Sequence, residues 1–129
     1  MKNTPSVDAW LKEAKAQAAA AGCGMFLVHN GVVRESARAL VREGAENTKP
    51  VKGMLFGYDE EKVAAAVKEA EALEGIACAR VWLNEGELRV GDDIMYVLVG
   101  GDIRPRVIDA LQFLVGKIKN ECVSETELY

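Results

Sequence analysis

The strand predicted at residues 94–100 constrains the fold more than any other feature of the sequence. Its residues, IMYVLVG, are almost all apolar, and a strand that is apolar on both alternating faces is typical of the buried interior of a sheet. A helix pattern begins near Pro105, a residue favoured in the first helical turn, with Asp102 close enough to cap it. Six apolar residues form a continuous stripe on this helix: Val107, Ile108, Leu111, Leu114, Val115 and Ile118.

The rest of the chain supplies further elements of both kinds. Helices are expected at residues 6–21, 35–46 and 59–74, the last with Asp59 as its cap. Strands are expected at residues 25–34, 51–57 and 76–83, with turns at 47–50 and 86–93. The acidic tail 121–129 shows no period. This order predicts one domain over residues 1–129, an α+β or α/β sandwich with helices packed against a single sheet.

The composition excludes several classes of protein. Of the 129 residues, 50% are hydrophobic and 28% are charged, a globular balance that argues against disorder. The net charge of -4 disfavours nucleic-acid binding, which depends on neutralising phosphates. No apolar run approaches the ~20 residues that span a membrane, and the N-terminus lacks the pattern of a secretory signal. We therefore expect a cytoplasmic protein that binds neither nucleic acid nor membranes.

Cysteine and histidine are too few for the common metal and catalytic clusters. Three cysteines without CxxC spacing disfavour a disulfide framework and a zinc site, and they fit a reducing cytosol. Cys23 and Cys78 are expected to be small buried residues, and Cys122 to be incidental in the polar tail. The single histidine, His29, is expected to be an ordinary strand residue rather than a ligand. Nucleotide-loop and hydrolase motifs are absent, and neither a metal nor a cofactor is expected.

Three stretches together resemble one known family, the large, catalytic subunit of molybdopterin synthase. LVHNGVVRE (27–35) resembles its F-x-G-x-V-R strand. LFGYDEEKVAAAVKEAEAL (55–73) resembles the segment that carries E-x-Y-x-x-M-A-x-x-x-L. GELRVGDDIMYVLVGGDIRPRVIDALQFLVGKIK (86–119) resembles its G-x-L-x-x-G-[DE] turn, the following strand and the last core helix. The stretches stand in the family order and cover most of residues 25–119.

The resemblance implies a fold, an assembly and a reaction. The fold would be of the α+β class, an α/β hammerhead with helices packed on a mixed, mainly antiparallel sheet. The assembly would be a homodimer with a small ubiquitin-like sulfur-carrier subunit. That subunit would end in Gly-Gly as a thiocarboxylate and insert its tail into a pocket of the large subunit. Sulfur would pass to cyclic pyranopterin monophosphate and build the dithiolene of molybdopterin.

The resemblance also assigns three candidate site residues. Arg34 matches the arginine that closes F-x-G-x-V-R, and Arg104 matches the arginine of an H-R pair before the last helix. Both are expected to bind substrate, because arginine suits the oxyanions of a phosphate or a carboxylate. Lys119 matches the first of two family lysines and is expected to be catalytic, as a general acid or through a transient bond to the partner's C-terminus.

Several departures from the family pattern leave the activity open. The family histidine is Ile103 here, and the second lysine falls near Thr126. The turn H-R-x-G is altered at residues 83–86, and residues 35–57 form a longer segment than usual. The sequence stops at Tyr129, whereas the family continues with a segment that embraces the partner. Three alternatives therefore stand: a working synthase, a non-catalytic relative that binds a ubiquitin-like partner or a pterin ligand, and a domain sharing the fold alone.

The helical period indicates which basic residues of the last helix lie near its apolar stripe. Lys119 lies nearer the apolar stripe than Lys117, and Arg106 is expected to point outward. Arg104 and Lys119 are separated by roughly 22 Å along one helix. A site that needs both is therefore expected to be built across a dimer.

Overall fold

Two three-stranded sheets organise the chain in the computed structural model, which describes residues 1–44 and 49–129, apart from the side chains of residues 38 and 39. The first sheet has the order β1–β5–β3, with β1 Met25–Val32, β5 Asp93–Gly101 and β3 Ile76–Leu83. The second sheet has the order β4–β2–β6, with β4 Gly86–Arg89, β2 Gly53–Tyr58 and β6 Val123–Leu128. All four strand pairings are antiparallel. The α+β class is confirmed, whereas the expectation of a single mixed sheet was wrong.

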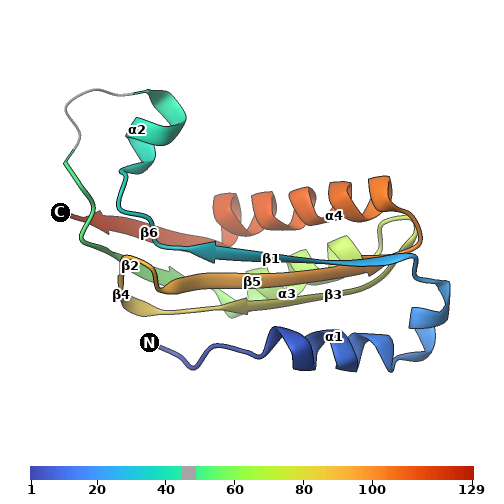
Figure 1. Cartoon of the computed structure of the whole chain (residues 1–129). Helices are drawn as coiled ribbons and strands as arrows, with labels where there is room; N and C mark the ends of the chain where they lie inside the picture. Colours follow the sequence, from blue (N-terminus) through green and yellow to red (C-terminus); the bar gives the residue numbers. More distant parts are fainter. Residues whose placement is uncertain (45–48) are drawn as a thin grey trace.

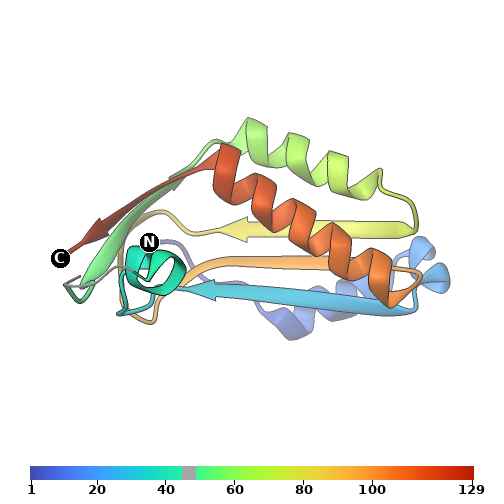
Figure 2. The same cartoon turned by 90° about the horizontal axis from the view of Figure 1, so that it is seen from above.

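The helices lie on both faces of the first sheet. They are α1 Val7–Lys15, α2 Arg38–Glu43, α3 Glu60–Glu71 and α4 Arg104–Lys117, with short segments η1 Ala18–Gly22 and η2 Ile118–Cys122. Helices α3 and α4 lie side by side on one face, and α1 covers the other (Figures 1 and 2). Helix α2 projects beyond the sheets at the end where β6 terminates (Figure 1). In the part of the chain that is described, no helix has the length and apolarity needed to cross a membrane.

Strand β5 is the buried centre that its apolar sequence predicts. Met95, Val97 and Val99 are fully buried on one face, toward the core. On the other face Tyr96 contacts the Trp10 ring of α1 edge to face, at 6.4 Å between centroids. The strand is therefore covered on both sides, because each set of alternating side chains has its own partner layer.

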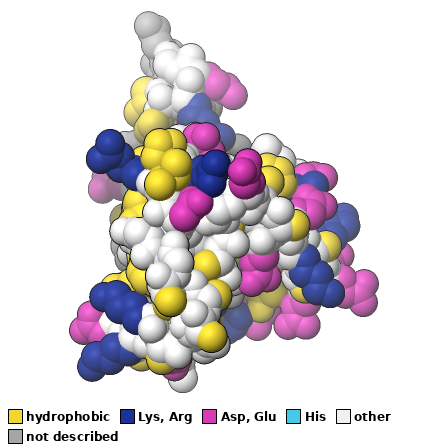
Figure 3. Space-filling view, turned by 90° about the vertical axis from the view of Figure 1, so that its right-hand side faces the viewer, with side chains coloured by type: hydrophobic (Ala, Val, Ile, Leu, Met, Phe, Trp, Pro, Cys, Tyr) yellow, Lys and Arg dark blue, Asp and Glu magenta, His cyan; other side chains and the backbone are white. Residues whose placement is uncertain are grey.

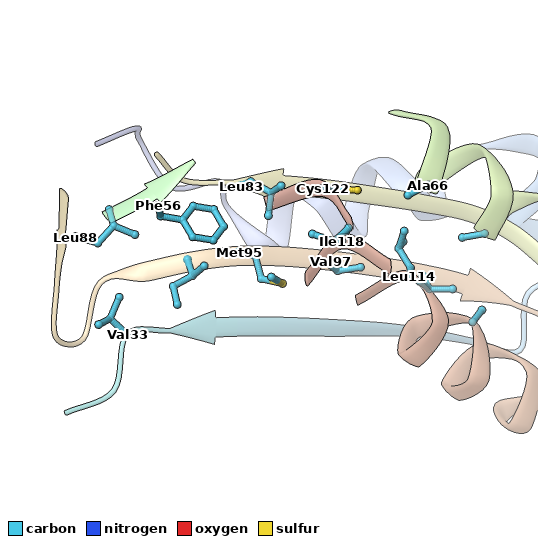
Figure 4. Packing of buried hydrophobic residues seen from close by; sticks show 14 of the residues in the cluster. Val33, Phe56, Ala66, Leu83, Leu88, Met95, Val97, Leu114, Ile118 and Cys122 are labelled. Atoms are coloured by element: carbon cyan, nitrogen blue, oxygen red, sulfur yellow. The ribbon is translucent and has the colours of Figure 1, made fainter. Parts of the chain in front are cut away.

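Helix α4 packs on the sheet through most of the predicted stripe. Val107, Leu114 and Ile118 are buried, and Ala110 fills the same face. Figure 4 shows Leu114 and Ile118 beside Val97 of β5, in the layer that continues toward Phe56 of the second sheet. This contact fixes the orientation of the helix and of the residues that follow it.

The sequence predicted the cap residue correctly for α3 but not for α4. The Asp59 carboxylate accepts hydrogen bonds from the backbone N–H groups of residues 61 and 62 and caps α3, as predicted. Asp102 does not cap α4, because the cap position is Ile103, one residue later. Asp102 instead accepts a hydrogen bond from the Ile103 N–H and pairs with Arg106.

The first helix is shorter than its composition indicates. It ends at Lys15, the backbone at Gln17 is extended, and residues 18–22 form the separate segment η1. No residue of η1 is buried, so the alanine run has no apolar face to pack. Good intrinsic propensity without tertiary packing does not sustain a helix of this length.

Two segments that were expected to be irregular are strands. The segment 86–93 holds the expected turn at residues 90 and 91, but it also contains β4, whose Leu88 is fully buried. The acidic tail forms β6. Along β6, Glu125 and Glu127 are partly buried, whereas Ser124 and Thr126 are exposed. This alternation is the period of two that defines a strand. The expected short helix within 35–46 is present as α2, and residues 47 and 48 of the expected turn at 47–50 lie outside the described residues.

Candidate functional site

A cavity of about 640 Å³ opens where the two sheets meet. Its walls come from β1 and β5 of the first sheet, β2 and β6 of the second sheet, α2, and the junction of α4 with η2. We call this cavity the anion pocket and define it by its five charged side chains and its histidine: His29, Arg34, Arg42, Lys119, Glu125 and Glu127. Figure 1 shows the elements that form it gathered around β6 and the end of α4.

The pocket brings together two of the three predicted site residues. Lys119 lies on η2, the π-helical turn that connects α4 to β6, and its side chain is 28% exposed. A π turn admits an extra residue and is frequent at functional sites. Arg34 follows β1 at the exposed side of the pocket, where its Nε donates a hydrogen bond to the Ser36 carbonyl at 3.2 Å.

Arg104 lies elsewhere. It is an exposed residue in the first turn of α4, at the opposite end from Lys119, and it does not line the anion pocket. Figure 3 views the end of the molecule where α4 begins, and basic and acidic side chains are interspersed on that face. Within one chain, Arg104 and Lys119 are thus at different ends of one helix.

Two other basic residues of α4 form ion pairs outside the pocket. Arg106 pairs with Asp102 at 2.7 Å and with Glu74 at 3.3 Å. Lys117 pairs with Glu69 at 2.9 Å, and the hydrogen bond to that carboxylate raises the pKa of Lys117. These contacts tie α4 to its neighbours.

Glu125 forms an ion pair with Lys119, and both side chains line the pocket. The Lys119 Nζ lies 3.8 Å from Glu125 Oε1, and the Glu125 side chain is only 13% exposed. In the register of β6 on β2, Glu125 stands opposite Phe56. The sequence predicted no regular structure for the tail that contains Glu125, so the contact between Glu125 and Lys119 was missed. The sequence carries no local signal for this contact, because residues 124–127 are all polar and β6 is defined by its pairing with β2.

His29 is a pocket residue that the sequence analysis treated as an ordinary strand residue. A Cβ atom placed on Gly31 would lie 3.6 Å from His29 Nε2, so the ring extends along the strand over this glycine. Partial burial lowers the pKa of His29, and the positive charge of Lys119 lowers it further. The signal for its position was the period of β1, since residues 29 and 31 share one face of the strand.

The cysteines differ from their expected environments. Cys122 is buried in the core instead of lying in a polar tail, and Cys23 and Cys78 are partly exposed. Burial raises the pKa of the Cys122 thiol, which disfavours the reactive thiolate. All three thiols are free, and no cluster of three or more potential metal ligands occurs among residues 1–44 and 49–129.

The anion pocket is suited to binding a negatively charged group. Arg34 and Arg42 can supply planar, paired donors for a phosphate or a carboxylate, and Lys119 adds a compact positive charge. The glutamates of β6 restrict where an anion can sit, because like charges repel.

Comparison with known proteins identifies the family. The family model described as MoaE protein matches residues 4–121. The chain belongs to the MoaE family. This is the family of molybdopterin synthase large subunits that the three sequence stretches resemble, and its members work in molybdenum cofactor biosynthesis. No curated protein sequence matches this MoaE-family chain.

Solved structures share the fold of this MoaE-family chain at low sequence identity. Molybdopterin synthase from Staphylococcus aureus is similar with a TM-score of 0.73 and 16% identity, over 97% of this chain and 85% of that one. A molybdopterin biosynthesis MoaE protein from Burkholderia ambifaria has the same score and identity over 98% and 84%. Subunits 1 and 2 of molybdopterin-converting factor from Helicobacter pylori form a complex that matches with a TM-score of 0.66 and 16% identity, over 100% and 86%.

Proposed function

We propose that this chain is the catalytic large subunit of a molybdopterin synthase. It takes sulfur from the thiocarboxylated Gly-Gly terminus of a small ubiquitin-like subunit and transfers it to cyclic pyranopterin monophosphate. One observation carries the proposal: in a chain of the MoaE family, Lys119 and Arg34 line the same cavity. The complex of two subunits seen for the Helicobacter pylori relative supports the choice of partner.

The charges of the pocket suit both reactants. The substrate carries a cyclic phosphate and the carrier tail ends in an anion, so each gains from Arg34 and Lys119. The thiocarboxylate sulfur is itself the nucleophile. It forms a new carbon–sulfur bond as a carbon–oxygen bond of the substrate breaks, and the departing oxygen takes a proton or remains on the phosphate. Water then cleaves the acyl–sulfur bond and leaves the carrier with a carboxylate. The protein therefore contributes positioning and electrostatic stabilisation, and Lys119 supplies a proton donor beside the reacting groups.

A sulfur-transfer assay tests this proposal. Purified protein is mixed with cyclic pyranopterin monophosphate and the thiocarboxylated carrier, and molybdopterin is measured. We expect product with the wild-type chain and a loss of about 100-fold or more with Lys119→Ala, the size of a general acid contribution. Lys117→Ala is the matched control, because Lys117 pairs with Glu69 outside the pocket. Absence of product from the wild-type chain would refute the catalytic assignment.

The exposed position of Arg104 supports a site built across a homodimer. Arg104 starts α4 and Lys119 follows the end of it, so a substrate that needs both would take them from two copies of the chain. We place this assembly in the cytoplasm, where the free cysteines would stay reduced.

Mixing two inactive variants tests the shared site. Arg104→Ala and Lys119→Ala should each be inactive alone. After the two are mixed and exchange subunits, one site of each mixed dimer is intact, and about a quarter of the wild-type activity should return. No recovery in a sample shown to contain mixed dimers would exclude a shared site.

The second candidate function is a non-catalytic relative that binds the same partner or a pterin. The observation that favours it is the character of β6: Glu125, Thr126 and Glu127 line the pocket near the position of the second family lysine. A stable complex with the carrier, without any molybdopterin formed, would support this candidate over the synthase.

A further inference from the structure

We propose that His29 is a further ligand-binding residue of the anion pocket, whose imidazolium form contacts the anionic group held by Lys119 and Arg34. This inference rests on the anion-binding part of the proposed function and not on sulfur transfer. The ligand chemistry is a phosphate, sulfate or carboxylate oxyanion. In the F-x-G-x-V-R pattern His29 occupies the aromatic position, so this chain has a titratable ring where the pattern has phenylalanine.

The geometry places the imidazole on the wall of the cavity. His29 and Gly31 both line the pocket, and the missing side chain at Gly31 leaves open the space beside His29 Nε2. A Cβ at Gly31 would also lie 3.2 Å from the Met95 side chain, so any larger residue there would crowd this wall. The glycine therefore keeps the imidazole edge accessible from the cavity.

The charged groups around the ring come from η2, α2, β6 and the segment after β1, whereas the pocket residues of β2, β5 and α4 are apolar. Lys119 faces it from η2, Arg34 follows its own strand, and Arg42 comes from α2. Glu125 and Glu127 face it from β6, and the Tyr129 side chain completes the rim. Of these groups, Lys119 is the one whose charge lowers the pKa of His29. An anion bound at Lys119 would offset that charge.

Thermodynamic linkage turns this arrangement into a measurable effect. If an anion binds the pocket with His29 protonated better than with His29 neutral, then anion binding must raise the pKa of His29 by the corresponding amount. A shift of one pKa unit corresponds to a tenfold change in affinity between the two protonation states. Anion affinity should accordingly rise as the pH falls through the range in which His29 titrates.

Sulfate is a suitable probe because it remains a dianion across this pH range. The chain has one histidine, so one NMR signal arises from an imidazole Hε1 proton, and it can be followed against pH. We expect the pKa of His29 to rise in saturating sulfate, and sulfate affinity to be about two- to tenfold higher near pH 5.5 than near pH 8. Identical titration curves with and without sulfate, or no sulfate binding near pH 5.5, would overturn the inference.

Variants separate ligand binding from a structural role. His29→Phe, which restores the residue of the family pattern, and His29→Gln should bind sulfate with an affinity that no longer increases at low pH. Arg80→Gln removes one positive charge on the opposite face of the first sheet, where Arg80 pairs with Glu13, and should keep the increase. If both His29 variants also bound sulfate more tightly at low pH, the inference would be wrong. The titration uses neither the carrier nor the pterin, so a failed sulfur-transfer assay leaves its result intact.

Discussion

Lys119 of η2 and Glu125 of β6 form an ion pair at the junction of these two elements, with 3.8 Å between Nζ and Oε1. The carboxylate is the more buried of the two side chains. Both side chains line the anion pocket. An anionic ligand in the pocket must therefore compete with Glu125 for the lysine charge.

Replacing Glu125 by glutamine should strengthen anion binding. The Glu125→Gln change keeps the size of the side chain and removes its negative charge, so both the competition for Lys119 and the repulsion of the ligand decrease. We expect the dissociation constant for sulfate, measured by calorimetry, to fall about tenfold, or ~1.4 kcal/mol. The control is Glu121→Gln, which removes a carboxylate that pairs with Lys117 instead. Equal affinities for Glu125→Gln and the wild-type chain would contradict the prediction.

Removing the Lys119 charge should raise the pKa of His29. Burial and the Lys119 charge both disfavour the imidazolium form, and Lys119→Met eliminates only the second cause. The pKa should therefore move up toward 6.5, the ordinary value, without reaching it. Proton NMR of the single imidazole measures this shift, and Lys117→Met should leave the pKa unchanged. A His29 pKa that stays the same in Lys119→Met would show that the two groups do not interact.

The lowered pKa of His29 also predicts how stability depends on pH. The unfolded chain takes up this proton near 6.5, whereas the folded chain takes it up only at lower pH. Between these values the unfolded state binds more protons, so its free energy falls and folding stability is lost as the pH decreases. Urea unfolding at pH 8 and pH 5.5 should show a smaller loss for His29→Phe than for the wild-type chain. The carboxylates are the same in both proteins and cancel in this comparison. Equal losses of stability in His29→Phe and the wild-type chain would therefore contradict the prediction.

The sequence predicted the fold where strong periodic patterns coincide with burial. Strand β3 begins and ends at the expected residues, and α3 begins after its Asp59 cap. The apolar run of β5 and the stripe of α4 were recognisable because each matches one structural period. The chain belongs to the family that these segments resemble.

The acidic tail and the division into two sheets required long-range information. Strand β6 is polar, and what makes it a strand is its pairing with β2, about half the chain away. For the same reason the sequence could not place Glu125 beside Lys119. The Lys119–Glu125 contact depends on the turn at η2 and on the register of β6, and neither has a local signature.

The position of Lys119 depends on how firmly the end of α4 is anchored, and a core substitution tests this. Leu114 is fully buried and packs one turn before η2, whereas Ile108 on the same helix is 37% exposed. Leu114→Ala should lower the free energy of unfolding by roughly 2–5 kcal/mol, because it leaves a cavity that the core cannot fill. Ile108→Ala should cost less than half of that, since part of its side chain is already in water. Chemical denaturation of both variants measures the difference. Equal losses would mean that α4 is not held through Leu114, and the pocket would then need another support for Lys119.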